Sequence, residues 1–173
     1  MDTEVVKDTK QPIEIEVVFT GYWRDCDKDK MPEEAGIYVV YRSSYNERWN
    51  YISLKEIIYI GKAENVRERV ANHEKLSLFK TKLKEGEELC YSFGEVEKDS
   101  LDIVENALIY AQKPEFNTEL KDDYYFTCPG NEIKKNVATI CRSLYKLYHL
   151  RCRQISISGI GISISLGKTK PSA

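Results

Sequence analysis

The chain has 173 residues, a formal net charge of −2 and a hydrophobic content of 42%. This length and composition favour one globular domain with short extensions, and no apolar stretch is long enough to cross a bilayer. The N-terminus (MDTEVVKDTK) lacks the basic-then-apolar pattern of a signal peptide, and the five scattered cysteines indicate reduced thiols. We therefore expect a cytoplasmic protein that binds no membrane.

Charge is unevenly distributed along the chain. Residues 61–84 carry 7 basic and 3 acidic side chains, and residues 124–173 carry 8 and 1. Residues 1–60 carry 8 and 12, and residues 85–123 carry 3 and 12. The net negative charge disfavours nucleic-acid binding, but the two basic blocks permit a basic face for a polyanion. Solvated surface is the alternative interpretation of each block.

Apolar patterns predict four strands. From Ile13 to Phe19 apolar and polar residues largely alternate, which is typical of a strand. Three more strands are predicted over residues 36–41, 57–60 and 88–95. The segment 36–41 (GIYVVY) is apolar on both faces, as in the middle of a covered sheet. Residues 23–32 are expected to form a loop, and residues 42–56 a long connection through which the two flanking strands pair.

Helical signals follow these strands. Asn65 is a suitable N-cap for a helix to about Glu74, with a second helical piece continuing to Lys84. Asp99 or Ser100 is expected to cap a helix that ends near Gln112, before a proline.

The C-terminal part carries two further patterns. After Pro129-Gly130, a stripe of apolar residues predicts a last helix with a basic outer face. The stripe consists of Ile133, Val137, Ile140, Leu144 and Leu147. Residues 155–166 alternate isoleucine and serine around two glycines, which fits a hairpin, an edge strand or an aggregation-prone extension.

Two of the helices place charged side chains on their apolar faces. Arg69 and His73 follow Val66 at i+3 and i+7, and Glu105 follows Leu101 at i+4. All three therefore share the core-facing stripe of their helix. An inward Arg and Glu form either a buried ion pair or a site where a metal ion and a phosphate complete the charge balance, and periodicity alone does not choose between them.

Tyr38 and Tyr59 lie on two of the apolar strands, where tyrosine commonly packs as core. Their neighbours suggest more. Gly36-Ile37-Tyr38 followed by Tyr59-Ile60-Gly61 resembles the two short motifs that name the GIY-YIG nuclease family. Residues 59–70 (YIGKAENVRERV) resemble the same run in the family's excision-repair members, and residues 104–117 (VENALIYAQKPEFN) resemble its metal-ligand segment.

The resemblance covers about residues 36–117 and implies an α+β fold, a small three-stranded antiparallel sheet flanked by helices. The N-terminal strand and the basic C-terminal helix would be additions to it. The expected parts are an N-terminal extension (1–33), a GIY-YIG nuclease domain (34–122), a C-terminal helical extension (123–154) and an Ile/Ser-rich tail (155–173).

This sequence departs from the family in two respects. Tyr59 follows Tyr38 by 21 positions, more than in the compact members and closer to some restriction-type members. Nothing in the chain resembles a separate DNA-targeting domain.

The resemblance also implies a catalytic set, consisting of Tyr38, Tyr59, Lys62, Arg69, His73, Glu105 and Asn117. Glu105 would hold one Mg²⁺ or Mn²⁺, since magnesium often uses only one or two carboxylates. Arg69 would bind a phosphate oxygen with its planar fork. One tyrosine would take a proton from the attacking water and the other would position water or phosphate. His73 would either accept the proton onward or orient a tyrosine hydroxyl.

These residues predict a metal-dependent endonuclease that hydrolyses phosphodiester bonds, with DNA as the expected partner and RNA as the alternative. Repair, restriction and mobile-element settings all fit. A non-cleaving nucleic-acid-binding or scaffolding module that keeps the fold is the competing hypothesis, and the oligomeric state is left open. The candidates for further phosphate contacts are Lys75, Lys80, Lys82, Lys84, Lys134, Lys135, Arg142 and Lys146.

Overall fold

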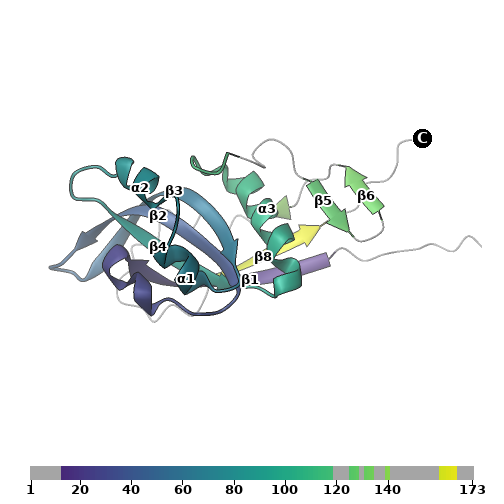
Figure 1. The fold of residues 1–173 in the computed structure, drawn as a ribbon, viewed down its shortest axis with the longest axis horizontal. Coiled ribbons are helices and arrows are strands. Elements are labelled where there is room, and N and C mark those ends of the chain that lie inside the picture. Colours follow the sequence, from purple (N-terminus) through teal and green to yellow (C-terminus); the bar gives the residue numbers. More distant parts are fainter. Residues whose placement is uncertain (1–12, 119–124, 129–130, 135–138, 141–159, 167–173) are drawn as a thin grey trace, which may run out of the picture.

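The computed structural model describes residues 13–118, 125–128, 131–134, 139–140 and 160–166 (Figure 1). Its strands are β1 (Ile13–Arg24), β2 (Gly36–Asn46), β3 (Tyr51–Ala63), β4 (Glu88–Glu95), β5 (Tyr125–Cys128), β6 (Asn131–Lys134), β7 (Thr139–Ile140) and β8 (Ile160–Leu166). The α-helices are α1 (Val66–Ala71), α2 (Leu76–Thr81) and α3 (Leu101–Gln112), and the short 3-10 helices are η1 (Asp25–Lys30) and η2 (Lys98–Ser100).

The main sheet has the strand order β3-β2-β4-β1-β8-β7, and every pair in it is antiparallel. The predicted three-stranded sheet is its β3-β2-β4 part, and the predicted N-terminal strand joins it as β1. The α+β class with helices flanking an antiparallel sheet is therefore confirmed. The sheet is wider than predicted because β8 and β7 extend it beyond β1.

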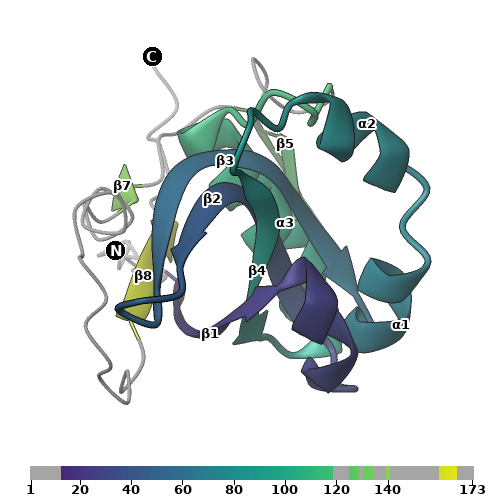
Figure 2. The ribbon, with the colours of Figure 1, turned by 90° about the vertical axis from the view of Figure 1, so that its left-hand side faces the viewer.

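Alternation along β2 divides the core into two clusters. Ile37, Val39 and Tyr41 are buried in one cluster with apolar residues of α3 such as Val104. Tyr38 is buried in the second cluster, with apolar residues of α1 and α2. Figure 2 shows α1 and α2 together on one flank of the sheet. Each large apolar side chain that is fully buried contributes roughly 1.5–3 kcal/mol, so both faces of β2 stabilise the sheet.

The long connection predicted over residues 42–56 is wrong. β2 continues to Asn46 and β3 begins at Tyr51, so only residues 47–50 form the turn. The charges in this stretch looked like loop residues, but they pair across strands. Arg42 Nη1 lies 3.0 Å from Glu56 Oε2, and Arg42 Nε lies 2.9 Å from Glu87 Oε2. A buried arginine is stable here because both carboxylates bind it.

The helices follow their sequence signals, with shorter ends. Asn65 is the N-cap of α1, and its side chain accepts a hydrogen bond from the Glu68 amide. α1 ends at Ala71 rather than near residue 74, and α2 is the predicted second piece. α3 ends where Lys113 adopts a left-handed conformation (φ 48°). The loop predicted over residues 23–32 is partly wrong, because β1 runs through Arg24 and η1 follows it.

The C-terminal elements differ from the prediction. Residues 131–134 and 139–140 of the predicted last helix form the strands β6 and β7, and its other positions lie outside the described residues. The β-branched residues of this stretch favour an extended backbone, and tertiary pairing decides it. Of the Ile/Ser-rich tail, Ile160–Leu166 forms β8, which pairs with all of β1 from Ile13 to Phe19. Its period of two is that of a β-strand, in which successive side chains point to opposite faces of the sheet.

Candidate active site

Strand register brings the two tyrosines together. In the β2–β3 pair, Tyr38 lies opposite Gly61, and Val40 lies opposite Tyr59. Tyr38 and Tyr59 therefore point to the same face of the sheet, and their ring centroids are 6.1 Å apart. His73, just beyond the end of α1, places its ring 5.1 Å from that of Tyr59 and 5.8 Å from that of Tyr38.

Gly61 is required by this arrangement. A Cβ at this position would collide with the Tyr38 hydroxyl oxygen and with the Tyr59 ring. Gly36, in the other short motif, lies equally close to the backbone of Gly94 on β4. Both glycines thus serve close approach rather than an unusual backbone conformation, since neither has a positive φ.

The His73 ring has a defined hydrogen-bonding pattern. The backbone N–H of Lys75 donates to Nδ1 over 3.0 Å, and Nε2 lies 3.0 Å from the Tyr38 hydroxyl oxygen. Burial and the nearby Arg69 lower the pKa of His73 to about 4, so the ring is neutral at pH 7. Because Nδ1 accepts, the single proton of the neutral ring resides on Nε2 and is donated to Tyr38. This geometry favours orientation of a tyrosine hydroxyl over proton acceptance.

Arg69 lies between the tyrosines and solvent. Its side chain is 37% exposed, and Nη2 lies 3.0 Å from Glu74 Oε1. Burial raises the pKa of Tyr38 well above its ordinary value, and Arg69 opposes this shift. Burial and the charge of Glu105 raise the pKa of Tyr59, whereas Tyr38 and Arg69 lower it. The guanidinium is thus positioned to stabilise negative charge on either oxygen while remaining open to an anion.

Glu105 extends from α3 toward the end of β3. Its side chain is 14% exposed, and its Oε2 lies 3.0 Å from Lys62 Nζ. Asp102, one turn earlier on α3, also contacts this ammonium group. Burial raises the pKa of Glu105, and Lys62 opposes that shift. An inward charge that sequence left ambiguous is therefore ion-paired with Lys62 rather than with Arg69.

The residues present fit a divalent cation. Two carboxylates converge on a single positive charge supplied by Lys62, so the same oxygens could hold a metal ion if the lysine moved aside. Among the described residues, no group of three or more His, Cys, Asp or Glu could hold a metal ion. A cation held by these two carboxylates would therefore take its other ligands from water and substrate.

Asn117 lies apart from the other members of the predicted set. Its amide is buried, with Oδ1 accepting from the Ile60 amide over 2.9 Å and Nδ2 donating to the Ile60 carbonyl over 2.8 Å. Phe116 donates its backbone N–H to the Ile58 carbonyl over 3.0 Å. Asn117 thus pairs with the outer edge of β3 as a neighbouring strand would, and it holds the end of α3 against that edge.

Several predicted phosphate contacts are engaged within the protein. Lys80 lies 3.5 Å from Asp25, and Lys82 contacts Glu115. Lys75 Nζ donates to the Phe116 carbonyl over 3.2 Å and lies 5.2 Å from the Tyr59 ring centroid. The side chains of the C-terminal candidates lie outside the described part of the chain.

Sequence reasoning missed two neighbours of the site, namely Glu74 and Asp102, and it named Lys75 only as a candidate phosphate contact. Asp102 had a usable signal, because it precedes Glu105 by three positions and therefore shares its side of a helix. Glu74 and Lys75 lie in the turn between α1 and α2, where periodicity carries no information about direction.

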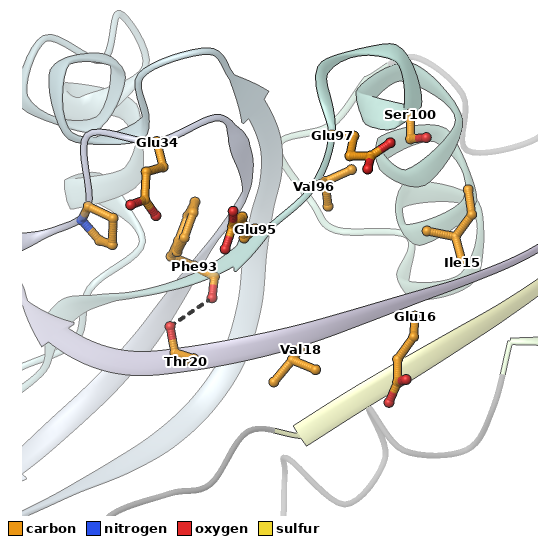
Figure 3. Close-up of a pocket in the computed structure, with 11 residues that line it drawn as sticks. Ile15, Glu16, Val18, Thr20, Glu34, Phe93, Glu95, Val96, Glu97 and Ser100 are labelled. Carbon is orange, nitrogen blue, oxygen red and sulfur yellow. Dashed lines mark hydrogen bonds between the residues drawn. The ribbon is translucent and has the colours of Figure 1, made fainter.

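A separate hollow of about 790 Å³ lies beside β1 and the end of β4 (Figure 3). Its floor includes Val18 and Phe93. Its lining also contains four carboxylates, from Glu16, Glu34, Glu95 and Glu97, and among the described residues no lysine or arginine pairs with them. Phe93 of this hollow lies opposite Tyr38, so the hollow is on the same face of the sheet as the two tyrosines. Its carboxylates disfavour a phosphate within the hollow itself.

Comparison with known proteins identifies related sequences. Residues 35–118 match the family model described as a UvrC-like GIY-YIG domain. UvrABC system protein C of Fervidobacterium nodosum is 33% identical over 96 residues, which cover 54% of this chain and 15% of that protein. The protein of the same name from Rickettsia canadensis is 35% identical over 98 residues, which cover 55% of this chain and 14% of that relative.

The chain thus spans about a seventh of the length of these curated relatives. No solved structure matches it significantly. Within the described part of the chain, no helix combines the length and apolar character needed to span a membrane.

Proposed function

Residues 35–118 belong to the UvrC-like GIY-YIG family, and from this premise we propose that the chain is a metal-dependent endonuclease that hydrolyses phosphodiester bonds in DNA. The observation that carries the proposal is the convergence of Tyr38, Tyr59, Arg69 and His73 at one end of the β2–β3 pair, with Glu105 close enough to affect the pKa of Tyr59. The relatives' role in the UvrABC system favours a repair setting over restriction.

In this proposal Glu105 holds one Mg²⁺ or Mn²⁺, with Asp102 within reach as a further or water-mediated ligand. The bound ion supplies positive charge that polarises the scissile phosphate and steadies the leaving oxygen. An ion held there would take the place of Lys62 on the carboxylates, and the lysine would then be available to the phosphate. Its 37% exposed side chain leaves it free to make that movement.

Arg69 binds a non-bridging phosphate oxygen and opposes the charge that builds during attack. To do so, the guanidinium must break its ion pair with Glu74 at the protein surface and bind the substrate phosphate instead. Surface ion pairs contribute roughly 0–1 kcal/mol, so the exchange costs little.

Tyr59 acts as the base that takes a proton from the attacking water, and Tyr38 positions that water. Tyr59 is 9% exposed and Tyr38 only 1%, so water reaches the Tyr59 oxygen more readily. The Tyr59 phenolate is a minor form at neutral pH, and the cations Arg69 and Lys75 stabilise it. The N–H at His73 Nε2 donates a hydrogen bond to the Tyr38 oxygen, and this fixes the direction of the Tyr38 hydroxyl.

The test is a cleavage assay with supercoiled, branched and single-stranded DNA, and with RNA, in the presence of Mg²⁺, Mn²⁺ or a chelator. We expect metal-dependent nicking of DNA. Glu105→Gln should lower the rate at least about 100-fold, because the ion it holds supplies several kcal/mol. Asn106→Ala, at the half-exposed position next to Glu105 on α3, is the matched control, and it should retain activity within about twofold.

The assay also separates the competing hypotheses. If Glu105→Gln cut DNA as fast as the unaltered protein, the assignment of Glu105 as the metal ligand would be ruled out. Preferential cutting of RNA would identify RNA rather than DNA as the substrate. A non-cleaving binding module, favoured by the net charge of −2, predicts DNA binding without nicking under every condition.

A further inference from the structure

The distal half of the β2–β3 pair extends beyond its pairing with β4, although Ile52 within it still packs against the core. β2 pairs with β4 only as far as Ser43, opposite Glu88. Beyond this point residues 44–53 pair only with each other, and we call this segment the arm. Its turn projects at the left of Figure 1. The arm accounts for the long spacing between Tyr38 and Tyr59.

Side-chain hydrogen bonds hold the turn of the arm in one shape. The Trp49 amide donates to Asn46 Oδ1 over 3.1 Å, and the Asn50 amide donates to the Glu47 carbonyl over 3.3 Å. The Tyr45 hydroxyl donates to Asn50 Oδ1 over 2.7 Å. Asn50 has a φ of 45°, a left-handed conformation that asparagine tolerates better than most residues. These hydrogen bonds fix the turn, and the Arg24 guanidinium, 3.8 Å from the Tyr45 ring centroid, joins the arm to β1.

The ordered turn exposes an aromatic ring. Trp49 is 65% exposed, the highest exposure among the large apolar side chains of the described residues. The Arg48 guanidinium lies 5.1 Å from its ring centroid, and Glu47 and Asn50 are exposed beside it. A single aromatic ring among polar neighbours lacks the apolar surround of a protein–protein hot spot. An aromatic ring with an adjacent arginine instead suits a nucleic-acid base and its phosphate.

The arm and the candidate site lie on the same strand. Tyr51, at the start of β3, precedes Tyr59 by eight positions, which span at most about 26 Å at roughly 3.3 Å per residue. The bulges in the β2–β3 pair shorten this span somewhat. In duplex DNA about 26 Å corresponds to about seven or eight base pairs.

Resting on the proposed function, we propose that Trp49 stacks on an unpaired base of duplex DNA, no more than about seven or eight base pairs from the bond cut at Tyr59. The ordered arm acts as a spacer between recognition and chemistry. The substrate class is therefore a duplex with a local unpaired base.

The test measures binding by the full chain carrying Glu105→Gln, so that the DNA stays intact. Trp49→Ala should weaken binding to a duplex with one unpaired base roughly tenfold or more, since stacking on one base supplies that much. Affinity for the fully paired duplex should change less than about twofold. Trp49→Phe keeps an aromatic face and should restore most of the preference.

Fluorescence and a surface control complete the design. The chain has two tryptophans, so DNA should quench the emission of the unaltered Trp49 protein but not that of Trp49→Phe, in which only Trp23 remains. Val18→Ala, which alters an exposed apolar residue on β1, should bind as the parent does.

The outcomes distinguish the two proposals. If the chain cuts DNA but Trp49→Ala keeps the full preference and quenching is absent, this inference is overturned and the proposed function stands. If no DNA is bound or cut by any variant, both are overturned. Loss of self-association in Trp49→Ala, measured by sedimentation, would identify a second copy of the chain as the occupant and also overturn the inference.

Discussion

His73 illustrates how one backbone amide can select the role of a side chain. The Lys75 N–H occupies Nδ1, so the neutral ring is a donor to Tyr38. Protonation of the ring would add a proton at Nδ1, where it would face that N–H and displace the hydrogen bond. The ring is also packed against Phe79, with centroids 4.9 Å apart, which disfavours a charged ring. Both contacts act in the same direction on its protonation.

This predicts a pH-dependent stability. The pKa of His73 is about 4 in the folded protein, below the ordinary value of 6.5, so the unfolded chain binds more protons between these values. The contribution of neutral His73 to the free energy of unfolding is therefore fully present above about pH 6.5, and it is lost as the pH drops toward 4. Between pH 6.5 and 5, we expect the free energy of unfolding to fall about 1–2 kcal/mol more than in His73→Gln. Urea titrations of both proteins at each pH measure the difference, and parallel pH profiles would contradict it.

At the scale of elements, the position of α3 relative to β3 decides whether Glu105 faces the tyrosines. The connection after α3 supplies Phe116 and Asn117, which bond to alternate residues of the β3 edge. An uncovered edge strand offers unpaired amides to other chains. The same contacts that cover this edge therefore hold the carboxylate of α3 in place.

Asn117→Ala tests this coupling. It leaves the amide and carbonyl of Ile60 without their buried partners, and it should lower the free energy of unfolding by about 2–3 kcal/mol. Asn106→Ala, a half-exposed position on α3, should change it by less than about 0.5 kcal/mol. Chemical denaturation measures both. If Asn117→Ala unfolded like Asn106→Ala, the segment after α3 would not hold the edge.

At the scale of the whole molecule, β8 extends the sheet beyond β1. It pairs with β1 from Ile13 to Phe19 and so turns an edge strand into an internal one. The GIY-YIG region, residues 35–118, contains neither strand. The sheet of this chain is thus completed by segments from both sides of that region.

Removing residues 155–173 should therefore expose the outer edge of β1. We expect a loss of stability on the order of several kcal/mol, because many backbone hydrogen bonds are lost at once, together with self-association through the exposed edge. Removing only residues 167–173, which follow β8, is the matched control and should leave a protein of unchanged midpoint. Light scattering and thermal denaturation measure both effects. A monomeric protein with an unchanged midpoint after the longer deletion would show that β8 contributes little.

Local sequence determined much of the core of this protein. The apolar strand 36–41, the strand 88–95, the Asn65 cap and the end of α3 near Gln112 were readable because each depends on neighbours in the chain. The spacing of Val66 and Arg69 held within α1, whereas His73 lies beyond the end of that helix and owes its position to the following turn. The α+β class and the family followed from such local patterns.

Tertiary structure alone decided the remaining features. The charged residues at 42–56 lie in strands because Arg42 pairs with Glu56 and Glu87, which are distant in the sequence. Likewise, the strands β6 and β7 form where the apolar pattern predicted part of a helix. The tautomer of His73, the pairing of Glu105 with Lys62 and the place of β8 also depend on contacts between segments far apart in the chain. Periodicity reports which face of an element is apolar, but it contains no information about which partner meets that face.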